Sequence, residues 1–401
     1  MWKKDIDIHE VKEIRVRPNV YFGVGAITKI ADIVKLLKAQ GNDKVIVVSG
    51  RGAYKATGAW AVVEAALQAD GVGYVNYDKV TPNPTTHQVD EAVALAKSFG
   101  ASAVIAIGGG SPIDAGKSVA VLMKYPERTC NDLYEFVFTP TKAAPVVAIN
   151  LTHGTGSETN RFAVVTIPEK DFKPAIAYDC LYPFASIDDP GLMTGLSPEQ
   201  TLYVSIDAVN HVVEAATAKT CSAFSISLAK EVVRMVVEFL PKALANPKDL
   251  EARYYLAYAS LLAGVAFDNG LLHYTHALEH PLSAVKHELA HGLGLAMLLP
   301  AVVKHIYAEK KNTLADIFAP IMVGEDLSAE AFAKQVEAWL FKVGVTSKLS
   351  DEGFTEADVV KLTELAFTTP SLGLLLSLAP NKSTREVVSA IYSESLKPYG
   401  A

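Results

Sequence analysis

The chain of 401 residues has few cysteines, and they lie far apart at Cys130, Cys180 and Cys221. None belongs to a Cys-x-x-Cys pair, which argues against a disulfide framework and against a thiolate zinc site. Scarce cysteine is typical of a reducing compartment, and residues 1–5 lack the apolar run of a signal peptide. We therefore expect a cytoplasmic protein.

Clustered positive charge and long apolar runs are also missing. The formal net charge is −7, whereas a nucleic-acid surface needs concentrated Lys and Arg. The most apolar segments, residues 293–303 and 372–378, are too short to span a bilayer. We expect neither a nucleic acid nor a membrane among the partners.

Hydrophobic residues make up 50% of the chain, enough for two domains with large cores. Before residue 187, apolar runs at 45–48, 103–107 and 145–149 alternate with helical patterns, which indicates buried parallel strands with helices on both faces of the sheet. After Ser197, a Ser-Pro helix start, the chain is rich in Ala and Leu. We predict an α/β domain over residues 1–187 and an all-α domain over residues 188–401, with the active site in the cleft between them.

Two glycine-rich turns follow predicted strands. Residues 108–117 read GGGSPIDAGK, in which glycines permit close approach of a ligand and Ser-Pro can open a helix. Backbone N–H groups at such a helix start bind anions such as a pyrophosphate, although the pattern is neither GxGxxG nor a P-loop. Residues 150–158 form the second turn. Both turns lie at carboxyl ends of strands, so we expect them to line one site.

Acidic and histidine residues in the second half form a pattern typical of metal ligands. Asp207 and His211 are four residues apart, on an otherwise apolar helical face where unpaired polar groups are costly to bury. Five of the ten histidines follow between residues 273 and 291. A carboxylate with imidazoles and no thiolate suits Fe(II) or Zn(II). The pattern predicts a divalent metal site.

Prolines in this half predict where its helices break. The breaks fall at Pro241, Pro247, Pro281, Pro300, Pro320 and Pro370. Because the residue before a proline disfavours helix, we expect His280 to lie at a helix end, lining a cavity.

Along essentially its whole length, the chain resembles the iron-containing (group III) alcohol dehydrogenases, a family related in fold to dehydroquinate synthase. The resemblance rests on GGGSxxDxxK at 108–117, GTGSE at 154–158, Asp-x3-His at 207–211 and the histidine motif at 276–292. Residues 18–26 and 81–85 are similar to further family segments.

The resemblance implies specific roles for the metal site. It makes Asp207, His211, His276 and His291 the ligands of Fe²⁺, with Zn²⁺ as the alternative, and makes His280 a proton relay beside the substrate. The interval from His280 to His291 is one residue longer than the family pattern, so His287 is a rival to His291.

The resemblance also implies a nicotinamide cofactor. In the family, an Asp at the position of Gly50 favours NAD; its absence here, with Ser49 and Arg51 beside it, favours NADP(H), with NAD(H) as the alternative. The other implied cofactor contacts are Asn83, Gly109, Gly110, Ser111, Asp114, Thr152, Thr155 and Lys173.

The function implied is that of a metal-dependent, NAD(P)-linked alcohol dehydrogenase or aldehyde reductase acting on a small alcohol or aldehyde. The family also suggests a homodimer, often built through the N-terminal strand. The alternatives are a dehydroquinate synthase-like enzyme or a glycerol-phosphate dehydrogenase relative using NAD and Zn, or a non-catalytic metal-binding protein. Few basic residues occur near Asp207 or within residues 271–299 beyond Lys286, which disfavours a phosphorylated substrate.

Overall fold

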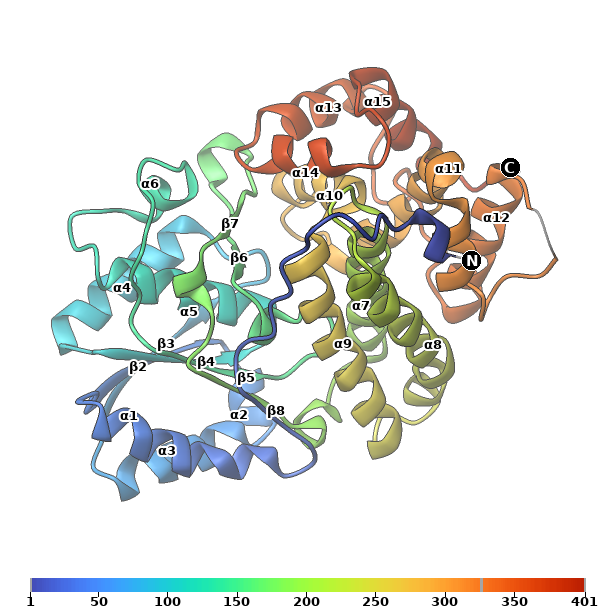
Figure 1. The fold of residues 1–401 in the computed structure, drawn as a ribbon. Helices are drawn as coiled ribbons and strands as arrows, with labels where there is room; N and C mark the ends of the chain where they lie inside the picture. Colours follow the sequence, from blue (N-terminus) through green and yellow to red (C-terminus); the bar gives the residue numbers. More distant parts are fainter. Residues whose placement is uncertain (1, 325–326, 400–401) are drawn as a thin grey trace.

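The computed structural model describes residues 2–324 and 327–399. Its core element is a six-stranded parallel sheet in the order β1–β8–β5–β4–β2–β3 (Figure 1). The apolar runs at 45–48, 103–107 and 145–149 fall in β2, β4 and β5, which confirms the predicted parallel sheet. The strands span Val20–Phe22 (β1), Lys44–Gly50 (β2), Gly73–Val80 (β3), Ala103–Gly108 (β4), Val146–Asn150 (β5) and Ala185–Asp188 (β8).

Helices cover both faces of this sheet, as predicted. Successive strand residues face opposite sides, so Val47 joins one apolar core and Val48 joins the other. The first core is closed by α1 and α3, and the second by α4, α5 and α6 (Figure 1). These helices, with the short α2, span Ile30–Ala39 (α1), Ala53–Ala56 (α2), Ala59–Ala69 (α3), Thr86–Phe99 (α4), Gly110–Leu122 (α5) and Cys130–Tyr134 (α6).

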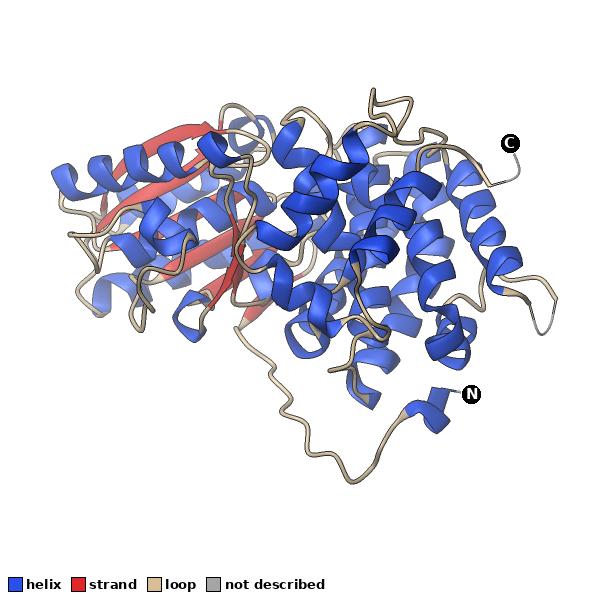
Figure 2. Ribbon diagram, turned by 90° about the horizontal axis from the view of Figure 1, so that it is seen from above, coloured by secondary structure: helices blue, strands red, loops and turns tan. Residues whose placement is uncertain are grey.

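The second half is helical, and Figure 2 shows its helices beside the strand-containing half. Its first helix, α7, starts where the Ser197 side chain accepts a hydrogen bond from the Gln200 N–H, and most of its residues are buried against neighbouring helices. The helices span Pro198–Thr217 (α7), Ala223–Ala245 (α8), Leu250–Gly270 (α9), Tyr274–Val285 (α10), His291–Ile317 (α11), Ala329–Val343 (α12), Asp358–Thr368 (α13), Leu372–Leu378 (α14) and Arg385–Glu394 (α15).

Between the parallel sheet and the helical half lies a small antiparallel hairpin of β6 (Phe162–Val164) and β7 (Ala175–Ala177). Its connection carries Lys173, one of the predicted site residues. The remaining short elements are 3-10 helices at Trp2–Asp5 (η1), Ala26–Lys29 (η2), Ser157–Thr159 (η3), Pro168–Lys170 (η4), Asp179–Leu181 (η5) and Pro190–Met193 (η6).

Three of the six predicted breaks, at Pro247, Pro320 and Pro370, fall between helices as expected. The breaks at Pro241, Pro281 and Pro300 are wrong, because these residues lie inside α8, α10 and α11. Proline costs a helix interior about 3 kcal/mol through its missing N–H and its ring. Both Pro281 and Pro300 are buried among apolar neighbours, so tertiary packing offsets that cost. His280 therefore lies within α10 rather than at a helix end.

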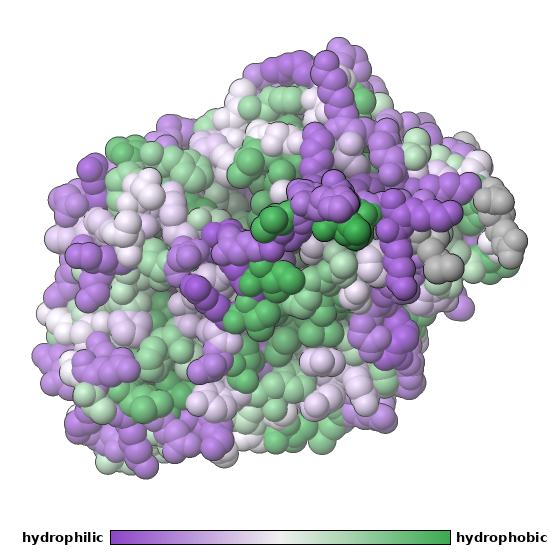
Figure 3. Space-filling model, in the orientation of Figure 1, coloured by the Kyte–Doolittle hydropathy of each residue, from purple (hydrophilic) through white to green (hydrophobic). Residues whose placement is uncertain are grey.

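Residues 6–19, here called the N-terminal strap, run from η1 beside α11 across α9 to β1 (Figures 1 and 2). The strap is tied to α9 at Arg15, whose N–H donates to Asn269 Oδ1 at 2.6 Å and whose carbonyl accepts from Asn269 Nδ2 at 2.8 Å. Several of its apolar side chains stay outside: Ile8 is 84% exposed and Val11 is 95% exposed. Figure 3 shows green apolar atoms on the strap and on the surface below it.

Across the part of the chain that the structure describes, no single helix has the length and apolar character needed to cross a membrane. Two bent pairs, α9 with α10 and α13 with α14, meet that test by length and composition only.

Candidate metal centre

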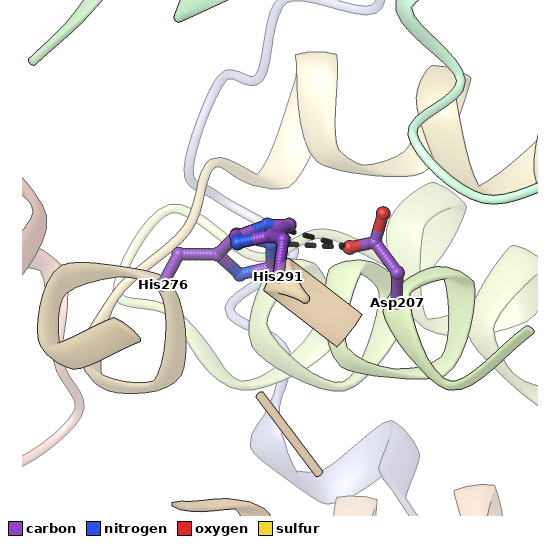
Figure 4. A group of neighbouring side chains, drawn as sticks. All are labelled: Asp207, His276 and His291. Carbon is purple, nitrogen blue, oxygen red and sulfur yellow. Dashed lines mark ion pairs between the residues drawn. The ribbon is translucent and has the colours of Figure 1, made fainter. Parts of the chain in front are cut away.

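The candidate metal ligands come from three helices that meet at Asp207 on α7. Asp207 Oδ1 lies 3.6 Å from His211 Nδ1 on the same helix and 3.5 Å from His276 Nε2 on α10. His291 Nε2, at the first residue of α11, is 3.8 Å from the same oxygen (Figure 4). The structure thus brings together residues separated by more than 60 positions in the sequence.

The four predicted ligands are not equivalent in this arrangement. Ligand atoms of Asp207, His276 and His291 all lie within 4.8 Å of one another. The His211 ring lies beside this group, stacked between His276 and Phe267 with ring centroids 4.5 Å from each. His287, the rival to His291, is exposed on the loop before α11, so the structure places His291 and not His287 beside Asp207.

Three candidate ligands each have a buried polar atom without a hydrogen-bond partner in the described part of the chain. Asp207 Oδ1, His211 Nδ1 and His276 Nε2 make no hydrogen bond to any described residue. Each such atom costs about 1–3 kcal/mol if it stays unsatisfied. Fe(II) and Zn(II) both bind carboxylate oxygens and imidazole nitrogens, so these residues fit a divalent cation.

Two buried glutamates fix the direction of the histidines. His276 Nδ1 is hydrogen-bonded to Glu214 Oε2, and His291 Nδ1 is hydrogen-bonded to Glu279 Oε2. Because a carboxylate only accepts, each Nδ1 donates its hydrogen to a glutamate, and each Nε2 is the nitrogen that faces Asp207. Carboxylates in this position commonly orient histidine ligands of metals.

Sequence reasoning missed both glutamates. Glu214 follows Asp207 by seven residues and His211 by three, which places all three on one face of α7. Glu279 follows His276 by three residues on α10. The helical spacing was therefore the available signal.

Glu214 also caps the start of α10. Its Oε1 accepts from the backbone N–H groups of His273 at 2.9 Å and Thr275 at 2.8 Å, and its Oε2 accepts from that of His276 at 3.3 Å. These N–H groups have no partner within the first turn of the helix, and they are buried. The same carboxylate therefore starts α10 and aims the His276 ring.

Burial and neighbouring charges shift the pKa values in the centre. Burial acts to raise the pKa of Asp207, but His211, His276 and His291 outweigh it and hold that pKa below its ordinary value. Burial lowers the pKa of His211 to about 4. Burial also acts to lower the pKa of His276, yet Glu214 and Asp207 outweigh it and raise that pKa to about 9. Binding a cation at His276 therefore displaces a proton at neutral pH, and affinity falls as pH decreases.

His280 lies next to the ligands, with its ring centroid 5.8 Å from that of His291. Its Nδ1 is 2.7 Å from the backbone oxygen of Lys173, so Nδ1 carries the hydrogen and Nε2 keeps a free lone pair. Burial holds the pKa of His280 well below its ordinary value. The neutral ring can accept a proton at Nε2.

The two glycine-rich turns meet, as expected for two walls of one site. A Cβ on Gly109 would lie 2.8 Å from Thr152 Oγ1, and a Cβ on Gly110 would lie 2.5 Å from Thr155 Cγ2. Helix α5 starts at Gly110, followed by Ser111, and no described side chain caps its first N–H groups. An uncapped helix start of this kind can bind a phosphate.

Three predicted cofactor residues contact other parts of the protein. Asp114 accepts hydrogen bonds from Ser157 Oγ and from the Val164 N–H. Asn83 Nδ2 donates to the His287 carbonyl at 2.9 Å. All three hydrogen bonds are to other parts of the protein, and a cofactor role for Asp114 and Asn83 stays a prediction. The third residue, Lys173, lies beside Glu279 and His291.

The residues predicted to select the cofactor lie at the carboxyl end of β2. Ser49 is buried, whereas Gly50 and Arg51 line an open cavity of about 400 Å³. Its other lining residues are Ala53, Val80, Thr81 and Pro82.

Similar proteins are known for the whole chain. The family model described as iron-containing alcohol dehydrogenase matches residues 18–190, and the model for the C-terminal part of the Fe-containing alcohol dehydrogenase family matches residues 201–396. The chain is 58% identical over 398 residues to the long-chain primary alcohol dehydrogenase AdhA of Thermoanaerobacter ethanolicus. The alignment covers 98% of this chain and 100% of that protein.

Solved structures show the same fold. An archaeal halo-thermophilic alcohol dehydrogenase from a Red Sea brine pool superposes with a TM-score of 0.89 at 28% identity, covering 97% of this chain and 100% of that one. The NADH-dependent butanol dehydrogenase A of Thermotoga maritima superposes with a TM-score of 0.87 at 30% identity, covering 97% and 99%.

Replacing Glu214 by Gln tests its double role. The variant removes the charge that orients His276 and caps α10, so we expect binding of a divalent metal to weaken by about 10–100-fold and thermal stability to fall. Chelator competition and thermal unfolding measure the two effects. Glu337→Gln is the matched control, since Glu337 is a buried carboxylate bonded to Lys348 outside the centre. Equal metal affinity in both variants would refute the assigned role.

Proposed function

Since the chain belongs to the iron-containing alcohol dehydrogenase family, we propose that it is a metal-dependent, NAD(P)-linked enzyme that interconverts primary alcohols and aldehydes. The observation that carries the proposal is the convergence of unpartnered donor atoms of Asp207, His211 and His276 in a buried site. The relative that is 58% identical is named for long-chain primary alcohols, which supports that substrate class.

The metal would be held by Asp207, His211, His276 and His291, with Fe²⁺ as the proposed ion and Zn²⁺ as the alternative. The iron named in both matching family models and the oxygen and nitrogen donors support this set. A divalent ion bound there supplies Lewis acidity, which lowers the pKa of an alcohol hydroxyl.

Residues around the centre would handle the proton and the carbon chain. His280 Nε2 accepts the hydroxyl proton and passes it to water, because its other nitrogen is fixed by the Lys173 carbonyl. The ring of Phe267 stacks on His211, and the ring of Phe162 lies 5.2 Å from that of Phe267. They would exclude water and offer an apolar surface to the substrate chain.

The cofactor would bind to the α/β half, residues 1–187, and meet the metal-binding half, residues 188–401, in the cleft between them. Gly109, Gly110 and Ser111 would bind the pyrophosphate beside Thr152 and Thr155. Asn83, Asp114 and Lys173 remain proposed further contacts. The nicotinamide supplies hydride transfer to or from the substrate carbon.

Ser49, Gly50 and Arg51 would bind the 2′-phosphate of NADP(H), since no acidic side chain at Gly50 would repel it. NAD(H) is the alternative, because the similar butanol dehydrogenase is described as NADH-dependent.

We further propose a cytosolic homodimer in which the strap of one copy packs against the strap of the other. The exposed apolar side chains of Ile8, Val11, Ile14 and Val16 support this interface, since such clusters mark association surfaces.

His276→Ala tests the proposed function directly. The variant removes a ligand, so we expect metal and alcohol-dependent NADP⁺ reduction to be lost together, by at least about 100-fold in activity. Elemental analysis and a series of n-alcohols with both nucleotides measure this. His305→Ala, which removes a histidine bonded to Glu394 far from the centre, should keep both properties. An active, metal-free His276→Ala protein would refute the mechanism.

Arg51→Ala tests the cofactor assignment. Loss of a charge-assisted contact with the 2′-phosphate should raise KM for NADPH by about tenfold or more and leave KM for NADH nearly unchanged. Arg128→Ala, at a half-buried arginine elsewhere, serves as the control. If Arg51→Ala raises KM for NADPH and NADH equally, Arg51 does not bind the 2′-phosphate.

Val11→Asp tests the proposed interface. A charge in the apolar strap should shift the protein from dimer to monomer in sedimentation velocity, because an unpaired charge is costly to bury. Val360→Asp, at a position on α13 that is 77% exposed, should leave the dimer intact. A Val11→Asp protein that stays dimeric would place the interface elsewhere.

A further inference from the structure

A second group of donor atoms lies beside the metal centre. Glu279, His280 and His291 each offer a ligand atom, and these atoms lie within 4.8 Å of one another. Glu279 and His280 are buried, and His291 belongs to both groups. By composition alone, this second group also resembles a cation site.

The ammonium of Lys173 already occupies this position. Its Nζ lies 2.8 Å from Ser283 Oγ, and 3.4 Å from both Glu279 Oε2 and His291 Nδ1. Lys173 is only 5% exposed, so its charge is poorly screened by water. An ammonium held here supplies the counter-charge for Glu279 and repels a second divalent ion.

Glu279 links Lys173 to the proposed ligand His291. Its side chain is fully buried, and its Oε2 accepts a hydrogen bond from His291 Nδ1 while lying 3.4 Å from the Lys173 ammonium. An ion pair with Lys173 therefore holds the carboxylate in the position from which it contacts His291.

His291 has more need of such a partner than His276. The side chain of His291 is 25% exposed, whereas that of His276 is 3% exposed. Packing alone therefore restrains the His291 ring less, and the bond to Glu279 sets its direction.

We propose that Lys173 is a positioning residue of the metal centre: its ammonium holds the carboxylate of Glu279 in place, and Glu279 in turn fixes the direction of His291. The inference rests on the proposed metal site. It gives Lys173 a role in metal binding that does not require the nucleotide.

Metal affinity without nucleotide is the decisive measurement. Chelator competition gives the Kd for Co²⁺ of the full-length, metal-free protein and of its Lys173→Met, Glu279→Gln and double variants. We expect each single variant to bind Co²⁺ about 10–100-fold more weakly, because removing the residues that orient a histidine ligand typically lowers metal affinity by that much. Since Lys173 acts through Glu279, the double variant should match Glu279→Gln within about twofold. The Co²⁺ absorption spectrum should change in all three variants.

Lys348→Met is the matched control, because Lys348 is another buried lysine, bonded to Glu337 at 2.7 Å outside the centre. It should lose thermal stability and keep the wild-type Kd for Co²⁺. Ser283→Ala removes the 2.8 Å partner of Lys173 and gives a milder variant if Lys173→Met does not fold. It too should bind Co²⁺ more weakly.

Wild-type affinity for Co²⁺ in Lys173→Met or Ser283→Ala would overturn the inference. So would a double variant whose loss of Co²⁺ affinity is the product of the losses in the two single variants. If Lys173→Met weakens only NADPH binding, Lys173 is a cofactor contact and the inference is wrong. A wild-type protein that binds no Co²⁺ would instead refute the proposed function, on which the inference rests.

Discussion

The carboxylate of Glu214 is buried at the point where the chain turns from α9 into α10, and it receives hydrogen bonds from backbone and side chain alike. The turn includes Leu271 at φ 62°, a backbone conformation that costs about 1–3 kcal/mol for a residue other than glycine. The N–H groups that follow would be unsatisfied in the core without an acceptor. One charged group thus starts the helix and orients His276, so local folding and ligand geometry depend on each other.

Charge balance extends this constraint to the whole centre. Three buried carboxylates, those of Asp207, Glu214 and Glu279, lie around the histidines. The ammonium of Lys173 and one divalent cation together would neutralise them, which suits a mononuclear centre. Asp207 and Glu214 raise the pKa of His276, which lies between them. A metal ion bound at His276 would therefore compete with a proton.

Much of this organisation was readable from the sequence. Short apolar runs predicted the strands because a parallel sheet buries both of its faces, and the four-residue spacing of Asp207 and His211 predicted one helical face. Three of the six proline breaks were wrong, since Pro281, for example, is held in α10 by packing that no local pattern reports. Glu279 was missed because an acid beside a histidine is usually solvated. The place of Lys173 depends on contacts more than 100 residues away in the sequence.

Two contacts from the α/β half complete the centre that the helical half begins. The backbone carbonyl of Lys173, between β6 and β7, sets the tautomer of His280, and Asn83 bonds to the carbonyl of His287 just before α11. Neither contact depends on a metal ligand itself. Movement of the hairpin away from α10 would free His280 Nδ1 and separate the Lys173 ammonium from Glu279 at the same time. In the proposed mechanism, proton acceptance by His280 and the direction of His291 would therefore be coupled through one residue that lies outside the helical half.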